Sequence, residues 1–475
     1  MVNTGRPSMD CFPCRRRKLR CDLKPETCGQ CRRARIPCHG YRNTQDLIFR
    51  DETHAAKKKV VARQWYYGNQ LAVLPQPGPN LNLDVVTQCR ETFFLLYVTG
   101  LSRSCASLLP LYNQVPMISH LSYSVDAVSL AFSAIQFENR ELASFAVKNY
   151  LAAVKSLGLS LREPNAVVSD EVLQSILLLD LYEKLMGPNL NMPGSWMTHI
   201  QGAMSMTESR GLLNDSNHIS TQLTRSAFSH LLISCGIARF PIPDSQTTVR
   251  NDLSRRVMDE KWDYMGILVD IVNLRAILPE IKTNLDSGIK ERAFEINRKL
   301  GYLEESLARS CGPVTVQADT ACHAYCLDGQ YDVYPNHYAM QTCNALRSMR
   351  LEMEDLMKDK CPGSSTNASE TINEIARQIC RTVPPYIMPH GRPENAEPFT
   401  PMQKLKCKVL LAPLFQAAQL STEACVQEWV WRSLEYMSER GNMRLAKEVL
   451  NLSKKRHNID HWTIWAMTGC YAMAA

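Results

Sequence analysis

Residues 11–38 read CFPCRRRKLRCDLKPETCGQCRRARIPC, and this stretch decides the fold of the N-terminal part of the chain. Its cysteines form two copies of the pattern C-x2-C-x6-C, namely Cys11, Cys14 and Cys21, then Cys28, Cys31 and Cys38. A structural zinc site takes four tetrahedral ligands, and thiolate is a preferred donor. Two zinc ions therefore need eight ligand positions, which six sulfurs supply only if two of them bridge both metals. The repeat predicts one bridging sulfur from each copy.

The spacing also predicts local structure. Each C-x2-C opens a short helix with basic residues, read as CRRRK in the first copy and CRRAR in the second. We expect the first helix to run from about Cys14 to Leu19 and Pro37 to end the second. So short a segment cannot bury enough apolar surface to fold alone, so the metal must supply its stability.

Taken together, residues 11–38 resemble the fungal binuclear zinc cluster, a two-zinc DNA-binding domain. The resemblance includes the basic signature from Arg15 to Asp22 and Pro25 in the loop between the copies. It implies two zinc ions per chain as the cofactor, with Cys11 and Cys28 as the bridging ligands. It also implies that Lys18 makes the principal contacts to a CGG triplet.

Two other interpretations of the cysteines are disulfides and a metallothionein-like thiol cluster. Disulfides belong to oxidising compartments, but the first residues, MVNTGRPSMD, contain no apolar signal-peptide core. A thiol buffer would not need the arginines.

The charge distribution favours nucleic acid as the partner. Residues 1–60 contain fifteen Lys or Arg against six Asp or Glu, although the whole chain has a net charge of only +7. We expect Arg17 and Lys18 to reach the guanine acceptors of the major groove. The other basic residues project around the two helices and are expected to contact the phosphate backbone. They are Arg15, Arg16 and Arg20 in the first copy, and Arg32, Arg33 and Arg35 in the second.

The composition predicts four regions. They are a disordered tail (1–10), the cluster domain (11–40), a basic linker (41–88) and an all-α regulatory domain (89–475). One such cluster reads only about three base pairs, so useful affinity normally requires two. Residues 39–88 nevertheless show no sustained heptad repeat, which leaves a homodimer as an expectation only. Lys57–Lys59 fit an extended DNA contact, a nuclear import signal or a solvated linker equally well.

Apolar spacings of three and four predict helices in the large domain. We expect a helix from Glu141 to Leu157 that Gly158 stops, and a second that Asp170 caps. Further helices are expected at 195–211, 422–440 and 443–456. Surface loops are expected at 309–336 and 361–370, and the proline-rich stretch 383–401 is a candidate boundary between subdomains. Strand signals are sparse, and the apolar runs are far too short to span a bilayer.

The large domain resembles, over residues 125–215, the regulatory region of many fungal transcription factors. The residues that carry this resemblance are Tyr182–Leu185, Trp196, His199, Gly202-Ala203 and Arg210-Gly211. From their side chains alone these are core and cap positions, with Gly202-Ala203 expected to let two helices approach closely. Cys322, His323 and Cys326 have ligand-like spacing, but no fourth partner is evident.

Three functions are therefore weighed. The first is a nuclear, sequence-specific regulator of RNA polymerase II genes that contacts the transcription machinery and answers to a small-molecule effector. Its resemblance to compact fungal regulators suggests control of a metabolic gene cluster. The second is a zinc-dependent scaffold that binds RNA or acidic protein. The third is an enzyme fused to a zinc module, although no phosphate loop, dinucleotide fingerprint, nucleophile elbow or HExxH site occurs in a proper context.

Overall fold

The computed structural model describes most of the chain. The described residues are 10–41, 83–102, 105, 107–116, 118–186, 197–212, 218–255, 257, 259–278, 287–320, 322–360, 368–455 and 459–468. The chain divides into two compact units, Met1–Val73 and Leu74–Ala475. The finer boundaries at 10, 40 and 88 stay predictions, and Lys57–Lys59 lie outside the described residues.

The first unit contains two short helices, α1 (Phe12–Arg16) and α2 (Gly29–Arg33). Cys11 is the extended N-cap residue of α1, and a proline in the first turn favours helix initiation there. The helix ends at Arg16 because Lys18 adopts a left-handed conformation, with φ 54°. The predicted range from Cys14 to Leu19 was therefore wrong at both ends.

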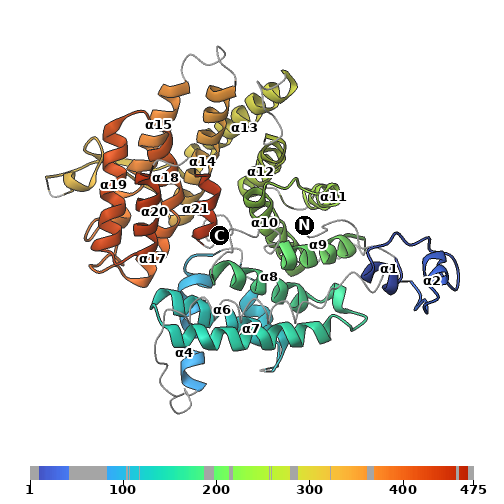
Figure 1. Cartoon of the computed structure of the whole chain (residues 1–475). Coiled ribbons are helices and arrows are strands. Elements are labelled where there is room, and N and C mark those ends of the chain that lie inside the picture. The colour runs from blue at the N-terminus through green and yellow to red at the C-terminus, as the bar shows by residue number, and fades with distance from the viewer. Residues whose placement is uncertain are drawn as a thin grey trace. The chain divides into compact units, whose positions relative to one another are not determined.

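The second unit is built mainly of helices (Figure 1). Its first elements are α4 (Leu83–Phe93), η2 (Phe94–Thr99), α5 (Leu108–Tyr112), α6 (His120–Gln136), α7 (Arg140–Ser160), η3 (Ala166–Val168), α8 (Asp170–Leu185), α9 (Met197–Leu212), α10 (His218–Ala238), α11 (Asp244–Leu253) and α12 (Glu260–Ile277). They are followed by α13 (Ser287–Cys311), β1 (Val314–Gln317), η6 (His323–Tyr325), β2 (Gln330–Val333), α14 (His337–Lys360), α15 (Ala368–Arg381), α16 (Pro384–Ile387), α17 (Pro401–Lys408), α18 (Leu411–Leu420), α19 (Ala424–Glu439), α20 (Arg444–Lys454) and α21 (His461–Met467). The prediction of a mainly α protein with a small cysteine-rich module and a large helical domain is confirmed.

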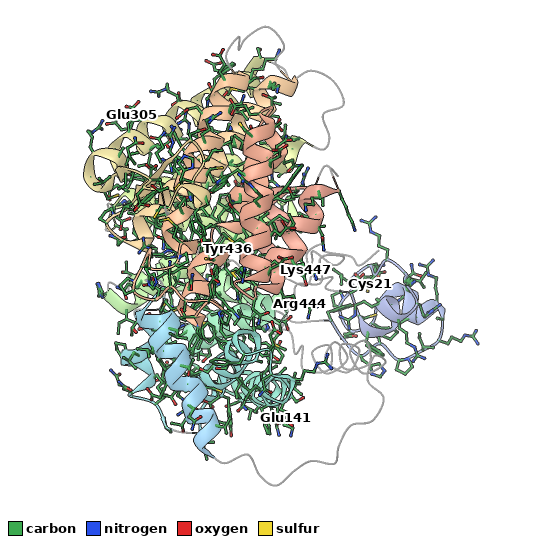
Figure 2. All side chains as sticks on the ribbon, turned by 90° about the vertical axis from the view of Figure 1, so that its left-hand side faces the viewer. Cys21, Glu141, Glu305, Tyr436, Arg444 and Lys447 are labelled. Carbon is green, nitrogen blue, oxygen red and sulfur yellow. The ribbon has the colours of Figure 1, made fainter. Side chains whose placement is uncertain are left out.

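The helices of the second unit form two packed groups joined through α10 and α12. In the first group, α6 packs against α4, α7 and α8. In the second, α18 packs against α14, α15, α19, α20 and α21. Figure 2 shows side chains filling the spaces between these helices, while the labelled Arg444 and Lys447 lie at the surface of α20. None of the described helices is both long and apolar enough to cross a membrane.

The C-terminal helix α21 links the two groups. Arg275 of α12 pairs with Asp460, at 2.6 Å, and with Glu352 of α14. The indole of Trp462 donates to Glu352 at 3.1 Å. Its ring also lies so close to Gly236 of α10 that a Cβ there would be 2.2 Å away. Glycine is therefore needed at position 236 for the two helices to meet.

Several predicted helix limits were wrong for local reasons. Helix α7 continues through Gly158 to Ser160, and a Cβ at Gly158 would meet nothing within 4 Å. Packing of α7 on α6 outweighs the roughly 1 kcal/mol that an interior glycine costs. Ser169, not Asp170, caps α8, because its hydroxyl accepts the Val172 amide at 3.3 Å. In the second unit, helices occur at each of the other predicted places.

The expected surface loop at 309–336 was also wrong. It contains the end of α13 and two short antiparallel strands, in which Val314 pairs with Val333 and Gln317 with Gln330. Strands of four residues are too short to give a clear alternating pattern. Residues 361–367 of the second expected loop lie outside the described part of the chain.

The proline-rich stretch 383–401 packs against the helices around it. Tyr386 and Phe399 are buried. The amide of Gln403 donates to the Tyr386 carbonyl at 3.0 Å, and that of Asn395 donates to the Pro385 and Met388 carbonyls. A subdomain boundary in this stretch stays a prediction.

Candidate metal centre and nucleic-acid interface

The two short helices bring the six predicted ligands together. Cys11 and Cys28 stand at the N-caps of α1 and α2, and the next cysteine of each copy lies in the first helical turn. The third cysteine of each copy returns after the helix. Cys38 is half-buried, and the other five cysteines are buried.

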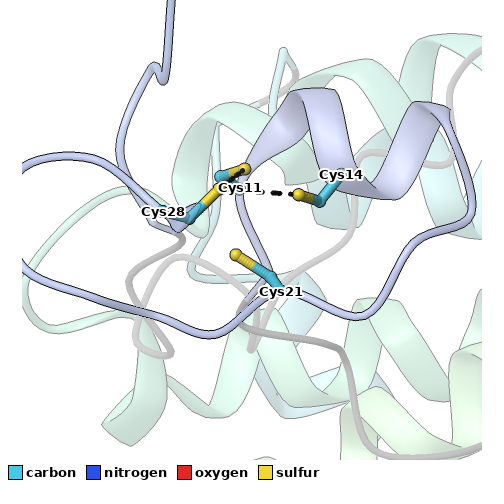
Figure 3. A group of neighbouring side chains, drawn as sticks. All are labelled: Cys11, Cys14, Cys21 and Cys28. Carbon is cyan, nitrogen blue, oxygen red and sulfur yellow. Dashed lines mark hydrogen bonds between the residues drawn. The ribbon is translucent and has the colours of Figure 1, made fainter. Parts of the chain in front are cut away.

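The sulfurs form two groups of four that share two members. One group is Cys11, Cys14, Cys21 and Cys28, and the other is Cys11, Cys28, Cys31 and Cys38. The sulfurs of each group lie within 4.8 Å of one another. Figure 3 shows the four side chains of the first group pointing toward a common centre.

The spacing of the sulfurs suits zinc. The Sγ atoms of Cys11 and Cys28 lie 3.7 Å apart, and those of Cys14 and Cys28 lie 3.6 Å apart. Zn–S bonds of about 2.3 Å in a tetrahedron place neighbouring sulfurs about 3.8 Å apart. Two groups of four soft donors with two shared members therefore fit two zinc ions, with Cys11 and Cys28 in the shared positions.

Protons compete with the metal at this site. Burial opposes ionisation of the Cys28 thiol, but hydrogen bonds from the Cys31 amide and the neighbouring thiols outweigh it and lower the pKa of Cys28 to about 6. Burial raises the pKa of Cys31 to about 12 and also raises that of Cys14. Metal binding must therefore displace protons from Cys14 and Cys31, so zinc affinity falls as pH falls.

The backbone repeats itself in the two copies. The amide of Lys18 donates to the Arg15 carbonyl at 3.1 Å, and that of Arg35 donates to the Arg32 carbonyl at 3.2 Å. Lys18 has φ 54° and Arg35 has φ 50°. The left-handed turn at Arg35 comes before Pro37, so the prediction that Pro37 ends the second helix was wrong. Lys18 and Arg35 are structural counterparts at the ends of their helices.

The basic side chains remain accessible around the cluster. Arg15 is half-buried, whereas the other predicted DNA-contacting residues are exposed: Arg16, Arg17, Lys18, Arg20, Arg32, Arg33 and Arg35. Arg33 also turns back along its own helix, where its Nε donates to the Gly29 carbonyl at 3.3 Å. The cluster thus combines a buried sulfur core with an exposed basic surface.

Two contacts around the cluster were not predicted from the sequence. The amide of Gly29 lies 2.9 and 3.1 Å from the two carboxylate oxygens of Asp22 and donates to them. The hydroxyl of Tyr41 donates to the Lys24 carbonyl. The acid directly after Cys21 and the glycine directly after Cys28 were the available signals for the first contact.

The remaining candidates have structural roles in the second unit. Cys322, His323 and Cys326 are not among the metal-competent groups of the described residues, and the Cys326 thiol instead contacts the Cys322 carbonyl. His199 lies 3.2 Å from the Tyr150 hydroxyl. A Cβ at Gly202 would meet nothing within 4 Å, so the expected close helix approach was wrong there.

Arg210, another residue of the second resemblance, also makes a structural contact. Arg210 pairs with Asp170 at 2.7 Å, linking α9 to the start of α8. Trp196 lies outside the described residues.

Comparison with known families agrees with this geometry. Residues 10–47 match the fungal Zn(2)-Cys(6) binuclear cluster domain, which binds two zinc ions. Residues 96–274 match the fungal specific transcription factor domain. No curated protein and no solved structure matches the chain significantly. The chain therefore contains a region that matches the fungal Zn(2)-Cys(6) binuclear cluster domain and one that matches the fungal specific transcription factor domain, and the two matches together support a DNA-binding transcription regulator of this fungal type.

Proposed function

We propose that the protein recognises CGG-type half-sites in duplex DNA through its zinc cluster, with Cys11 and Cys28 as the bridging ligands. The observation that carries the proposal is the left-handed turn at Lys18. This turn follows the C-cap residue of α1, and the long cationic side chain of Lys18 is exposed. A lysine so presented can reach the guanine O6 and N7 acceptors in the major groove.

The neighbouring basic residues divide the remaining contacts. Arg17, at the helix end beside Lys18, is the second base-reading residue. The other exposed arginines supply phosphate contacts, which orient the module on DNA and make its affinity depend on salt. These are Arg16 and Arg20 in the first copy and Arg32, Arg33 and Arg35 in the second, with half-buried Arg15 beside them.

The helical unit controls when the bound protein acts. In this proposal the protein works in the nucleus on RNA polymerase II genes, including those of a metabolic gene cluster, and contacts the transcription machinery. It acts through binding and not through catalysis. Two copies on paired half-sites would supply the affinity that one small module lacks.

A small-molecule effector is part of the proposal but needs a larger cavity than the one lined by residues of η2, α8 and α10, among them Tyr97, Leu177 and His230. That cavity has a volume of about 10 Å³. A cavity of this volume holds about one water molecule. An effector at this place would have to open the contact between α8 and α10.

A gel-shift titration with a CGG half-site duplex and a scrambled duplex tests the proposal. We expect tighter binding to the CGG duplex, and Lys18→Ala should cost about 1–3 kcal/mol on that duplex alone. Lys24→Ala, which removes an exposed lysine outside the helices, is the matched control. Equal affinity of the wild type for both duplexes would favour a general nucleic-acid scaffold instead.

A further inference from the structure

We infer that Asp22 and Gly29 form a clamp that positions Cys28 for both zinc ions. The Asp22–Gly29 clamp is the pair of hydrogen bonds from the Gly29 amide to the Asp22 carboxylate, at 2.9 and 3.1 Å. Neither residue is a proposed metal ligand. The inference rests on the assignment of Cys28 as a shared ligand under the proposed function.

Both residues of the Asp22–Gly29 clamp are next to predicted zinc ligands in the chain. Asp22 directly follows Cys21, and Gly29 directly follows Cys28. Both cysteines belong to the same group of four sulfurs. The clamp therefore ties together the backbone beside two ligands of one zinc ion. Because Cys28 also belongs to the second group, its position affects both ions.

Gly29 leaves room for the carboxylate, which lies close to its Cα. A Cβ at this position would be 2.6 Å from Oδ2 of Asp22, which is closer than side-chain carbon atoms approach. Gly29 does not have a positive φ, so the requirement is for space and not for a left-handed backbone. A side chain at position 29 must push Oδ2 aside and so breaks one of the two hydrogen bonds, whereas Oδ1, 3.9 Å from that Cβ, can keep the other.

Little else holds the loop between Asp22 and Cys28. Residues 23–27 are exposed, and Leu23 and Glu26 both have positive φ values. The hydroxyl of Tyr41 contacts the loop at the Lys24 carbonyl. The Asp22–Gly29 clamp thus joins the end of the first copy to the start of the second helix.

The start of α1 differs from the start of α2 within the described residues 10–41. Phe12 is the counterpart of Gly29 at the start of α1, and its side chain is 56% exposed. No side chain caps α1, whereas the Cys28 sulfur itself accepts the Cys31 amide at the start of α2. The start of α2 is therefore held by the hydrogen bonds of the Gly29 and Cys31 amides.

Zinc competition in the full-length protein tests the inference. Each variant is loaded with zinc and titrated with a chromogenic chelator, and zinc loss is followed together with the far-ultraviolet circular dichroism of the helical unit. Asp22→Ala should weaken zinc binding about tenfold, the size of effect seen when hydrogen-bonding partners of ligands are removed, and Gly29→Ala, which disturbs one of the two hydrogen bonds, should weaken it by less. Both zinc ions should be lost together, since Cys28 serves both.

Two further variants separate the clamp from general effects. Asp22→Asn keeps one acceptor oxygen and should recover affinity to within about threefold of the wild type. Glu26→Gln removes the same charge from the same loop and should have no effect. The double variant of Asp22→Ala with Gly29→Ala should be no worse than Asp22→Ala alone, because that change already removes both acceptors of the clamp.

The outcomes distinguish the clamp from the proposals on which it rests. The inference is overturned if Asp22→Ala holds zinc as well as Glu26→Gln does, if one zinc ion leaves alone, or if the two single losses add. A wrong bridging assignment would instead appear as a wild-type zinc content other than two per chain. A failure of CGG recognition would appear only in duplex binding.

Discussion

Lys18 and Arg35 have the same backbone conformation, yet the proposed function gives them different tasks. Both follow a short helix in a left-handed turn, and both side chains are exposed. Their neighbours differ, because Arg17 precedes Lys18 whereas Ala34 precedes Arg35. The first turn therefore presents two adjacent long cations to a groove, and the second presents one.

If Arg35 contacts only phosphate, its loss should not change sequence preference. Arg35→Ala should weaken binding to CGG and scrambled duplexes by the same factor and reduce the slope of log affinity against log salt by about 0.9. Lys18→Ala, in contrast, should reduce the preference for the CGG duplex over the scrambled duplex. Titrations of both variants at several salt concentrations provide the measurement. A loss confined to one duplex would make Arg35 a base-reading residue.

The two kinds of cysteine should differ in their effect on metal content. Cys28 belongs to both sulfur groups, whereas Cys38 belongs to one. Cys28→Ser should therefore reduce zinc at both sites, and Cys38→Ser should mainly damage one. Elemental analysis of the purified full-length variants measures this directly. Similar zinc contents in the two variants would contradict a shared role for Cys28.

At this scale the sequence predicted chemistry better than contacts. The six cysteines could be grouped from their spacing, because ligand positions around a small metal site are set by short loops. The Asp22–Gly29 clamp could not be predicted from the sequence, since it joins residues seven positions apart through a hydrogen bond that only the folded loop creates. The end of α1 was missed because the left-handed state of Lys18 has no sequence signal.

At the scale of elements, helix existence was predictable and helix ends were not. Apolar periodicity locates α7, α19 and α20 because one face of each must be buried, whereas α8 is an apolar run that is buried on nearly every side. Their limits depend on packing and caps. Gly158 does not stop α7, and the cap of α8 is Ser169, one residue before the expected Asp170.

Helix α14 begins with a histidine that makes stability depend on pH. Nδ1 of His337 lies 3.3 Å from the Tyr386 hydroxyl, and Nε2 is buried with no hydrogen-bond partner among the described residues. Burial, together with the positive charges of Lys406 and Arg392, lowers the pKa of His337 to about 3. The folded protein therefore holds this imidazole neutral where an unfolded chain would protonate it.

The sign of the effect follows from this lowered pKa. The unfolded chain binds a proton below about pH 6.5, but the folded protein resists it down to about pH 3, so stability falls as pH falls through this range. His337 adds at most about 1.4 kcal/mol per pH unit to the slope of the free energy of unfolding against pH. The free energy of unfolding, measured with urea at several pH values between 7 and 4, should fall less steeply with decreasing pH for His337→Gln than for the wild type. His323→Gln, at an exposed position, is the matched control.

At the scale of the whole molecule, the family match ends before the helical fold does. The fungal specific transcription factor domain is matched to residue 274, within α12. The next residue, Arg275, joins α12 to Glu352 of α14 and to Asp460 beside α21. The C-terminal helices therefore belong to the same compact unit as the matched region. Their packing has no short motif and could not be predicted from the sequence.

The division into two units predicts that zinc removal acts on one of them. The core of the first unit is the buried sulfur cluster with Ile36, Cys38 and Tyr41 packed against it. So small a core cannot hold the chain without metal, whereas the second unit has an extensive apolar core of its own.

A strong chelator should therefore abolish DNA binding and remove the hydrogen-exchange protection of residues 11–38. The urea midpoint of the helical unit, followed by circular dichroism, should not change. Adding zinc back should restore both binding and protection. Protection of residues 11–38 that survives complete zinc removal would mean that protein contacts, and not the metal, hold the module together.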